Sequence, residues 1–234
     1  MLEKFKKHVE SQFPQLMEQT SVLAISGGLD SVVLAHLLHK LDYSIIFAHC
    51  NFKLRAAESD KDAEFVEKLA QNLKTPVFIQ GFNTQAYAED HKRSTQMAAR
   101  ELRYAWFEEL RQQRKATFIL TAHHANDTLE TFLINLSRGS GIDGLLGIPQ
   151  ENGAIIRPLL LFSRKEIEEY ALNNGLEWRE DASNASDKYL RNHFRHHAIP
   201  SLQQAEPQFL SNASRSIEHL QDSRALVDDY ISFI

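Results

Sequence analysis

The stretch that decides the fold is residues 22–38, VLAISGGLDSVVLAHLL. Its apolar runs and its adjacent glycines, Gly27 and Gly28, predict a buried strand, a turn and a helix that opens near Asp30. Adjacent glycines let backbone N–H groups approach an anion closely, and the helix N-terminus adds the positive end of its dipole. We therefore expect a phosphate-binding loop, although a plain glycine turn would show the same two glycines.

The polar side chains of the loop extend this prediction. Ser26 and Ser31 offer hydroxyl donors, and the Asp30 carboxylate can hold a divalent metal that accompanies phosphates. The loop matches neither GxxxxGK[ST], which contains a phosphate-binding lysine, nor GxGxxG. The prediction therefore depends on the SGGLDS string in its strand-to-helix context.

The composition is that of a globular protein. A length of 234 residues with 43% hydrophobic and 24% charged residues predicts one sizeable domain with an appendage. The N-terminus has no apolar signal-peptide core, and no apolar run approaches the ~20 residues that span a bilayer. A single cysteine, Cys50, excludes an intrachain disulfide and a zinc site of several thiolates. We expect a cytoplasmic protein without a membrane segment.

The net charge of −5 does not favour nucleic-acid binding by the chain as a whole. A local basic surface would have to bind RNA. The best candidate is YLRNHFRHH, residues 189–197, which contains Arg191, Arg195 and His196.

Strand-like and helical segments alternate along the chain, which predicts an α/β fold: a doubly wound, mostly parallel sheet with helices on both faces. The expected strands are 22–26, 45–49, 77–81 and 118–122, and the expected helices between them are 31–41, 60–73 and 95–113. Ligands of such sheets bind beyond the carboxyl ends of the strands. The residues to inspect are therefore 26–31, 49–55 and 122–127.

The C-terminal third has its own signals. Ser163 and Glu166 form a capping box that predicts a helix over 164–174, and the glycine-rich stretch 138–147 favours a functional or hinge loop. Residues 207–234 look helical and end in apolar positions that need a partner. We expect a catalytic domain over 1–200 and a helical extension over 201–234, which either continues into a longer protein or contacts a second copy in a homodimer.

A second chemical cluster follows the fourth strand: TAHHANDTLET, residues 121–131. Asp127 and Glu130 are three residues apart on one helix face, where they could bind a metal or a cationic amine. His123 and His124 at the strand end could reach a phosphate or a base. The alternative is that Asp127 only favours the helix N-terminus and that both histidines are solvated.

Other motifs are weaker by themselves. Arg100 and Arg103 share one side of a helix and could project toward one anion, but a charged helix face is usually only solvated. In HCNFKLR, residues 49–55, Cys50 could suggest a persulfide carrier, but a lone thiol is more often inert packing. The polar loop at 180–192 is most often turn chemistry.

Taken together, the motifs resemble the tRNA(Ile)-lysidine synthases, a subfamily of the SGGxDS-loop ATP pyrophosphatases with an adenine nucleotide alpha-hydrolase-like fold. After SGGLDS, the matches follow in order as HCNFKLR, AAR-ELRY, TAHHANDTLET, SRGSGIDGLLG, RPLL with SRKEIEEY, and EDASN with YLRNHFR. They extend from Val22 to about Pro200.

The resemblance implies a ligase that uses ATP and L-lysine to convert the wobble cytidine of a tRNA(Ile) with a CAU anticodon into lysidine. It implies that Asp30 holds Mg²⁺, that Arg103 stabilises an adenylated intermediate, and that Asp127 and Glu130 orient the lysine. The implied ATP-binding residues are Ser26, Gly27, Gly28, Leu29, Asp30, Ser31, His49, His123 and Arg138.

The chain departs from the family pattern in two respects. Phe52 stands where HxNHxLR has its second histidine, so no role of that histidine can be transferred. Synthetases of this kind commonly continue into C-terminal domains that grip the acceptor stem, so we expect ATP binding with weakened tRNA affinity.

Three other functions compete with lysidine formation. A tRNA thiolase generally needs paired cysteines or an iron–sulfur site, which one cysteine cannot supply. Amide-forming relatives that make GMP, NAD or asparagine share the loop but lack AHHANDTLET and RGSGIDGLLG. A non-catalytic nucleotide-binding module, such as an electron-transfer flavoprotein, does not require the pair of Asp127 and Glu130.

Overall fold

The computed structural model describes residues 1–54, 57–180 and 190–232. The chain forms two compact units. Unit 1 comprises Met1–Ala122, Glu151–Leu159 and Lys165–Glu180, and unit 2 comprises His123–Gln150, Leu160–Arg164 and Asp181–Ile234. Arg55, the EDASN residues 181–184 and Tyr189, which belong to predicted motifs, lie outside the described residues.

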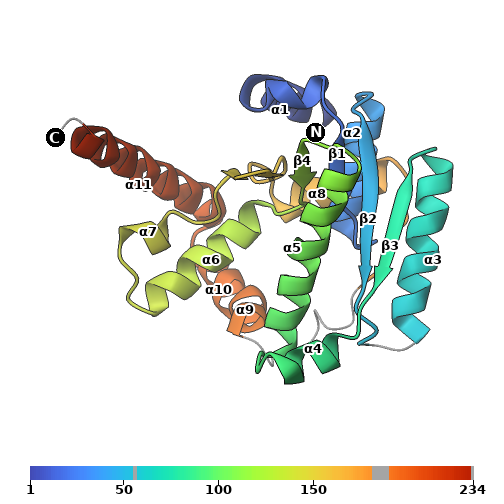
Figure 1. The fold of residues 1–234 in the computed structure, drawn as a ribbon. Coiled ribbons are helices and arrows are strands. Elements are labelled where there is room, and N and C mark those ends of the chain that lie inside the picture. Colours follow the sequence, from blue (N-terminus) through green and yellow to red (C-terminus); the bar gives the residue numbers. More distant parts are fainter. Residues whose placement is uncertain (55–56, 181–189, 233–234) are drawn as a thin grey trace. The chain divides into compact units, whose positions relative to one another are not determined.

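Unit 1 contains a mixed sheet whose strand order among the described residues is β3-β2-β1-β4-β6-β5 (Figure 1). Its strands are β1 (Ser21–Ala24), β2 (Ile45–Asn51), β3 (Val77–Gly81), β4 (Phe118–Leu120), β5 (Glu151–Asn152) and β6 (Ile155–Ile156). All neighbours pair in parallel except β5 and β6. The predicted α/β fold with a mostly parallel sheet is confirmed. The short β5–β6 hairpin was not predicted.

The helices of unit 1 cover the sheet on both faces. They are α1 (Leu2–Gln12), η1 (Pro14–Met17), α2 (Leu29–Lys40), α3 (Ala57–Asn72), α4 (Thr84–Asp90), α5 (Thr95–Gln113) and α8 (Arg164–Asn173, in unit 1 from Lys165 on). Figure 1 shows α5 in front of β1 and α2 behind it. Phe107 and Leu110 of α5 pack on Val22, Ile46 and Ile119 of three adjacent strands, so one core cluster joins this helix to the sheet.

The order of the strands determines where a ligand site can form in unit 1. From β1 the chain moves to β2 and β3 on one side, and it then returns to place β4 on the other side of β1. Ser21 of β1 is in register with Ile45 of β2 and with Phe118 of β4. The carboxyl end of β1 is therefore a topological switch point, where open parallel sheets bind their ligands. The SGGLDS loop begins there.

Unit 2 is helical in its described part. Its elements are α6 (Ala125–Ser137), α7 (Ile142–Leu145), α9 (Leu190–His193), the π-helical turn η3 (Phe194–Ala198), α10 (Ile199–Ala205) and α11 (Phe209–Ser232). Leu129, Ile199 and Ala213 form its buried core, against which Leu133 and Phe209 pack. The predicted extension 201–234 lies within this unit, and the domain boundary at residue 200 stays a prediction.

The glycine-rich stretch and the end of α11 add detail to what the sequence predicts for unit 2. The glycine-rich stretch predicted as a loop contains the single turn α7, which Gly141 precedes in an extended conformation. The apolar positions near the end of α11 are exposed, with Leu226 at 71% and Tyr230 at 69%. Among the described residues, no helix is both long enough and apolar enough to cross a membrane.

Candidate active site

The SGGLDS loop turns at Gly27, whose φ of +87° lies in the left-handed region. A Cβ atom at this position would also approach Cδ1 of Phe65 to 3.2 Å. Only glycine therefore fits without strain. Gly28 is extended and caps α2, whose first turn supplies N–H groups without partners inside the helix. The loop thus has the conformation expected of a phosphate-binding turn.

The hydroxyl groups of Ser26 and Ser31 hold the loop together. Ser31 Oγ accepts a hydrogen bond from the Ser26 N–H at 3.2 Å and donates one to the Gly28 carbonyl at 2.9 Å. Ser26 Oγ accepts from the Gly28 N–H at 3.2 Å, and the two hydroxyl oxygens are 3.1 Å apart. This network orients the loop before any ligand binds, which lowers the entropic cost of binding.

The side chains of Leu29 and Asp30 lie in different environments. Leu29 is only 3% exposed, so its side chain belongs to the core and only its backbone N–H can serve a phosphate. Asp30 is half-buried in the first turn of α2. A single carboxylate beside a phosphate loop suits Mg²⁺, which is usually bound by one or two carboxylates together with the phosphates of the substrate.

His49 connects β2 to the start of the loop. It is 4% exposed, and its Nδ1 lies 2.9 Å from the carbonyl oxygen of Ile25. Since the carbonyl can only accept, Nδ1 carries the proton and Nε2 is left as an acceptor. Burial lowers the pKa of His49, and the hydrogen bond to Ile25 and the charge of Asp62 only partly oppose this effect. His49 is therefore neutral at neutral pH.

Arg179 was not among the predicted site residues, yet it supports the loop. Its backbone N–H donates to the Gly27 carbonyl at 2.9 Å. Its guanidinium donates to Asp62 Oδ1 and to Glu58 Oε2, both at 2.7 Å. The side chain thereby ties the segment that follows α8 to α3. No local sequence pattern indicates this role, because the partners are more than 100 positions apart.

Arg103 lies on α5 next to an aromatic side chain. Its Cζ is 5.2 Å from the ring centroid of Phe52, which is within the range of a cation–π contact. Arg100 instead lies over Tyr104, at 4.8 Å, so the two arginines contact different aromatic rings. Cys50 is nearby, and burial raises the pKa of its thiol to about 12 despite the opposing charge of Arg103. The thiol stays protonated at neutral pH, which favours the packing role over that of a persulfide carrier.

In unit 2, α6 begins with a reciprocal cap. His124 N–H donates to Asp127 Oδ2 at 3.0 Å, and the His124 side chain accepts from the Asp127 N–H. His124 is 5% exposed, so the alternative of a solvated histidine does not apply to it. Asp127 therefore does favour the helix N-terminus, as the simpler interpretation expected. Its second oxygen, however, has other partners.

Those partners are two arginines predicted as tRNA contacts. Arg191 Nε lies 2.6 Å from Glu130 Oε2, and Arg195 Nε lies 2.6 Å from Glu130 Oε1. Both guanidinium groups also reach Asp127 Oδ1 at 3.4 Å. The side chain of Glu130 is only 1% exposed, and a buried carboxylate is very costly unless it is paired. The structure thus joins two predicted groups, the acidic pair and the basic segment, in one network.

The ionisation of Asp127 follows from this network. Burial by itself raises the pKa of a carboxyl group, but His124 in its protonated form, Arg191, protonated His123 and the His124 N–H outweigh it. The pKa of Asp127 is consequently lowered, and the carboxylate is ionised at neutral pH. Two carboxylates face two guanidinium groups, so the formal charges of this cluster balance.

The other predicted residues of unit 2 are Arg138, His123 and His196. Arg138 is exposed and forms the C-cap of α6, immediately before Gly139, whose φ is +73°. His123 is half-buried, and its charge acts on Asp127. His196 is half-buried in η3, with its ring centroid 6.3 Å from that of His197. π-helical turns of this kind are frequent at functional sites.

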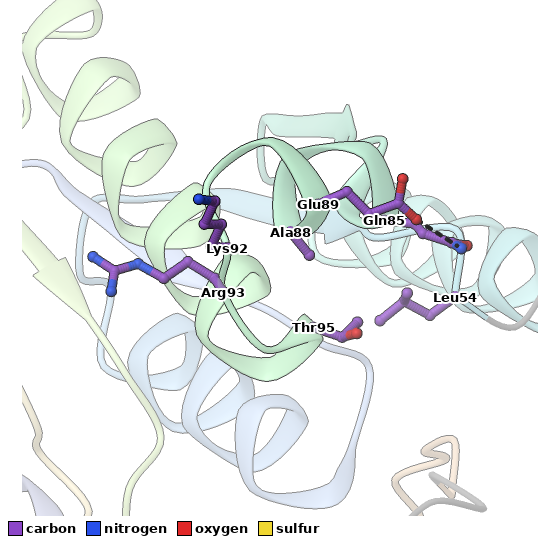
Figure 2. A pocket seen from close by; sticks show the side chains of 7 residues that line it. All are labelled: Leu54, Gln85, Ala88, Glu89, Lys92, Arg93 and Thr95. Carbon is purple, nitrogen blue, oxygen red and sulfur yellow. Dashed lines mark hydrogen bonds between the residues drawn. The ribbon is translucent and has the colours of Figure 1, made fainter.

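A cavity of about 500 Å³ in unit 1 has a different lining. Its residues are Leu54, Gln85, Ala88, Glu89, Lys92, Arg93 and Thr95 (Figure 2). Figure 2 shows the charged ends of Lys92 and Arg93 pointing away from Leu54 and Thr95. None of the predicted site residues lines this cavity, and we assign it no part in the chemistry.

Comparison with known proteins yields matches over most of the chain. The family model described as a PP-loop domain matches residues 1–202. A tRNA(Ile)-lysidine synthase of Bacteroides thetaiotaomicron is 41% identical over 225 residues, which cover 96% of this chain and 53% of that protein. One of Chlorobaculum tepidum is 37% identical over 97% of this chain and 71% of that protein. The chain spans about half the length of the Bacteroides relative.

Among solved structures, the U34-tRNA thiolase NcsA of Methanococcus maripaludis, determined with its [4Fe-4S] cluster, is similar with a TM-score of 0.74. The similarity covers 94% of this chain and 78% of the thiolase at 16% sequence identity. At this identity the match supports the fold and says nothing of the reaction.

Proposed function

Since this chain belongs to the PP-loop domain family and, within it, to the tRNA(Ile)-lysidine synthases, we propose that it performs the ATP-dependent ligation that forms lysidine. In the proposed reaction, O2 of the wobble cytosine in a CAU anticodon attacks the α-phosphorus of ATP and releases pyrophosphate. The lysine ε-amine then attacks C2 of the adenylated base, loses a proton and displaces AMP.

The observation that carries this proposal is the conformation of the SGGLDS loop at the switch point of the sheet. Pyrophosphate needs fixed donors as its charge develops, and the N–H groups of Gly27 and Gly28 with the hydroxyls of Ser26 and Ser31 could supply them. The Gly28 N–H already donates to the Ser26 hydroxyl. A phosphate oxygen would therefore exchange hydrogen bonds with a loop that is already shaped.

We propose that Asp30 holds the Mg²⁺ that accompanies ATP. Mg²⁺ usually keeps one or two protein carboxylates and takes its other ligands from substrate phosphates and water, which fits an ion delivered with the nucleotide. When bound, Mg²⁺ would act as a Lewis acid on the phosphate oxygens. Neutral His49, with Nε2 as an acceptor, would complete the nucleotide contacts together with His123 and Arg138.

Arg103 is proposed to stabilise the adenylated intermediate. Its guanidinium lies over the Phe52 ring, and a cation–π contact leaves the N–H groups available to phosphate oxygens. Arg191, Arg195 and His196 are proposed to contact tRNA. The exposed fractions of the Arg191 and Arg195 side chains, 42% and 35%, are compatible with such contacts.

Asp127 and Glu130 are proposed to bind the lysine substrate. Because two guanidinium groups already balance these carboxylates, an ammonium group gains a carboxylate partner only where an arginine contact is given up. The phosphates of tRNA would compete for the same arginines. A lysine amine is almost wholly protonated at neutral pH, so one of the freed carboxylates would also ease loss of its proton.

Radiolabel transfer tests the proposal. The chain is incubated with ATP, Mg²⁺, labelled lysine and saturating tRNA(Ile) that has a CAU anticodon, and we expect ATP-dependent label in the tRNA together with AMP and pyrophosphate. A tRNA with a UAU anticodon is the control. Asp30→Ala should abolish AMP and pyrophosphate, whereas in a passive nucleotide-binding module it would only alter affinity. No incorporation by a longer chain that binds ATP would contradict the proposal.

Thiolation of tRNA receives no support from this chain. Its one cysteine, Cys50, cannot by itself hold an iron–sulfur cluster, and burial keeps its thiol protonated. A cytoplasmic location and a homodimer through the apolar end of α11 remain predictions.

A further inference from the structure

Phe52 lies directly after β2 and belongs to an aromatic group in unit 1. Its ring stacks on Phe82 with centroids 5.6 Å apart and an interplanar angle of 22°. Phe82 in turn meets Trp106 edge to face at 6.3 Å. Arg103, one helical turn before Phe107 on α5, places its guanidinium carbon 5.2 Å from the Phe52 centroid. The Phe52 ring thus has the Phe82 ring and a cation as neighbours.

The backbone around Phe52 is held from several directions. The Phe52 carbonyl accepts a hydrogen bond from Thr84 Oγ1 at 3.0 Å, and Thr84 is 2% exposed. The preceding Asn51 accepts from the Phe82 N–H at 2.9 Å through its carbonyl, and its side chain accepts from the Lys53 N–H at 3.0 Å. These hydrogen bonds fix the backbone that carries the Phe52 ring. A side chain that packs on this ring is therefore held in a defined position.

Some cations near Arg103 are held by carboxylates. Arg111 pairs with Glu108 at 2.6 Å, and Arg93 pairs with Glu101 at 3.2 Å. In the part of the chain that the structure describes, Arg103 has no such carboxylate partner, and its recorded contact is with an aromatic ring. An aromatic face attracts a guanidinium without using its N–H donors. The positive charge and the donors of Arg103 consequently remain for an anion.

We infer that Phe52 is a positioning residue for Arg103, holding the guanidinium by a cation–π contact so that its N–H groups meet the phosphate of the adenylated intermediate. The inference rests on the proposed function, which gives Arg103 that phosphate as its partner. It also gives a role to the residue at which this chain departs from the HxNHxLR pattern. A phenyl ring keeps its attraction for a cation at every pH, whereas a histidine loses it on protonation.

A double-mutant cycle on AMP affinity tests the inference. AMP carries the phosphate that the intermediate would present, and its binding to the 234-residue chain is measured by calorimetry. We expect Phe52→Leu to weaken AMP binding about 3- to 10-fold, as loss of a half-buried cation–π contact would. Phe52→Tyr, which keeps the ring, should stay within about two-fold of the parent. In an Arg103→Met background, Phe52→Leu should have no further effect.

Phe78→Leu is the matched control, because Arg114 lies over the Phe78 ring at 4.1 Å on β3. It removes the same kind of contact from the same unit and should leave AMP affinity unchanged. Thermal unfolding checks each variant, and Phe52→Met replaces Phe52→Leu if the latter does not fold. The inference is overturned if Phe52→Leu leaves affinity unchanged, if it acts equally with and without Arg103, or if Arg103→Met itself leaves AMP binding intact.

The double-mutant cycle and the lysine-transfer assay can each give a negative result independently of the other. Wild-type protein that binds AMP but transfers no lysine to tRNA would contradict the proposed reaction, while coupling between Phe52 and Arg103 would still be measurable. Conversely, lysine transfer by the wild type with no coupling in the cycle would overturn only the positioning role of Phe52.

Discussion

Arg195 places its Nε 2.6 Å from Oε1 of Glu130, a carboxylate whose side chain is 1% exposed. The two residues are 65 positions apart, and Arg191 contacts the other oxygen of the same carboxylate. The acidic face of α6 is therefore tied to the segment that contains α9 and η3. This network has consequences for stability that can be measured independently of any activity.

Arg195→Met should destabilise the protein by about 3 kcal/mol, near the lower limit for breaking a buried ion pair, because Arg191 still pairs with Glu130. Urea unfolding measures the change. Arg224→Met is the control in the same unit, since Arg224 faces the 72% exposed Asp143 at 3.4 Å. An exposed pair of this kind contributes less than about 1 kcal/mol. Equal losses in the two variants would contradict a special role of the Glu130 network.

Asp127 should make stability depend on pH at the acid end. Its folded-state pKa is lowered, so its ionised form stabilises the protein above the unfolded-state value of about 3.9. That contribution is lost as the pH falls through the folded-state pKa. Asp127→Asn should therefore be less stable than the parent at pH 7, and the difference should shrink below about pH 4.

Thermal unfolding from pH 7 to pH 3 measures this difference. Asp143→Asn, which alters an exposed aspartate, should stay close to the parent throughout. A gap between Asp127→Asn and the parent that stays constant over the whole range would show that the carboxylate charge does not matter.

Gly27→Ala should abolish tight ATP binding. A left-handed φ costs a non-glycine residue roughly 1–2 kcal/mol, and here the added methyl group also meets the Phe65 ring at 3.2 Å. The loop must shift, and we expect at least a tenfold loss of ATP affinity by calorimetry, about 1.4 kcal/mol. Gly153→Ala is the control, because Gly153 has a φ of +58° but no atom within 4 Å of the added Cβ, and strain at that turn should leave ATP affinity unchanged. ATP affinity that survives Gly27→Ala would mean that the turn is not the phosphate site.

Arg179→Met should weaken ATP binding several-fold without removing a group from the loop itself. The guanidinium anchors this residue to Asp62 and Glu58, and its backbone N–H holds the Gly27 carbonyl. Loss of the anchor should make the loop less ordered, which raises the entropic cost of binding. Arg111→Met, which breaks the pair with Glu108 on α5, should not affect ATP affinity. The same loss of affinity in both variants would point to general destabilisation.

Local patterns were sufficient for much of the fold. The strand at Val77–Gly81 and the helix at Thr95–Gln113 were predicted with their observed bounds, and in the structure the Ser94 side chain caps this helix. The predicted boundaries elsewhere differ by a few residues, as for α2, which begins at Leu29 rather than Ser31. The β5–β6 hairpin escaped prediction because strands of two residues show no periodicity.

The candidate site was predicted less completely, for a physical reason. Short-range spacing in the sequence is enough to predict the glycine pair, Gly27 and Gly28, and the acidic pair, Asp127 and Glu130. It does not predict the partners of Glu130, since Arg191 and Arg195 come from a segment more than 60 positions away. The same holds for Arg179, whose N–H binds the Gly27 carbonyl, and for Phe52, whose ring contacts Arg103. Long-range pairings of this kind are properties of the fold, and a single sequence does not record them.

The shared carboxylate of Glu130 also affects how genetic data on this protein would be interpreted. In a mutational scan scored by growth or by product, a change at Arg191 or Arg195 would remove a basic group. It would also leave the buried Glu130 carboxylate without one of its ion-pair partners. The phenotypes of such changes would then cluster with those of Glu130, whatever either arginine touches in a complex. Only a scan that scores protein abundance and activity separately can distinguish residues that contact RNA from residues that stabilise the fold by pairing with Glu130.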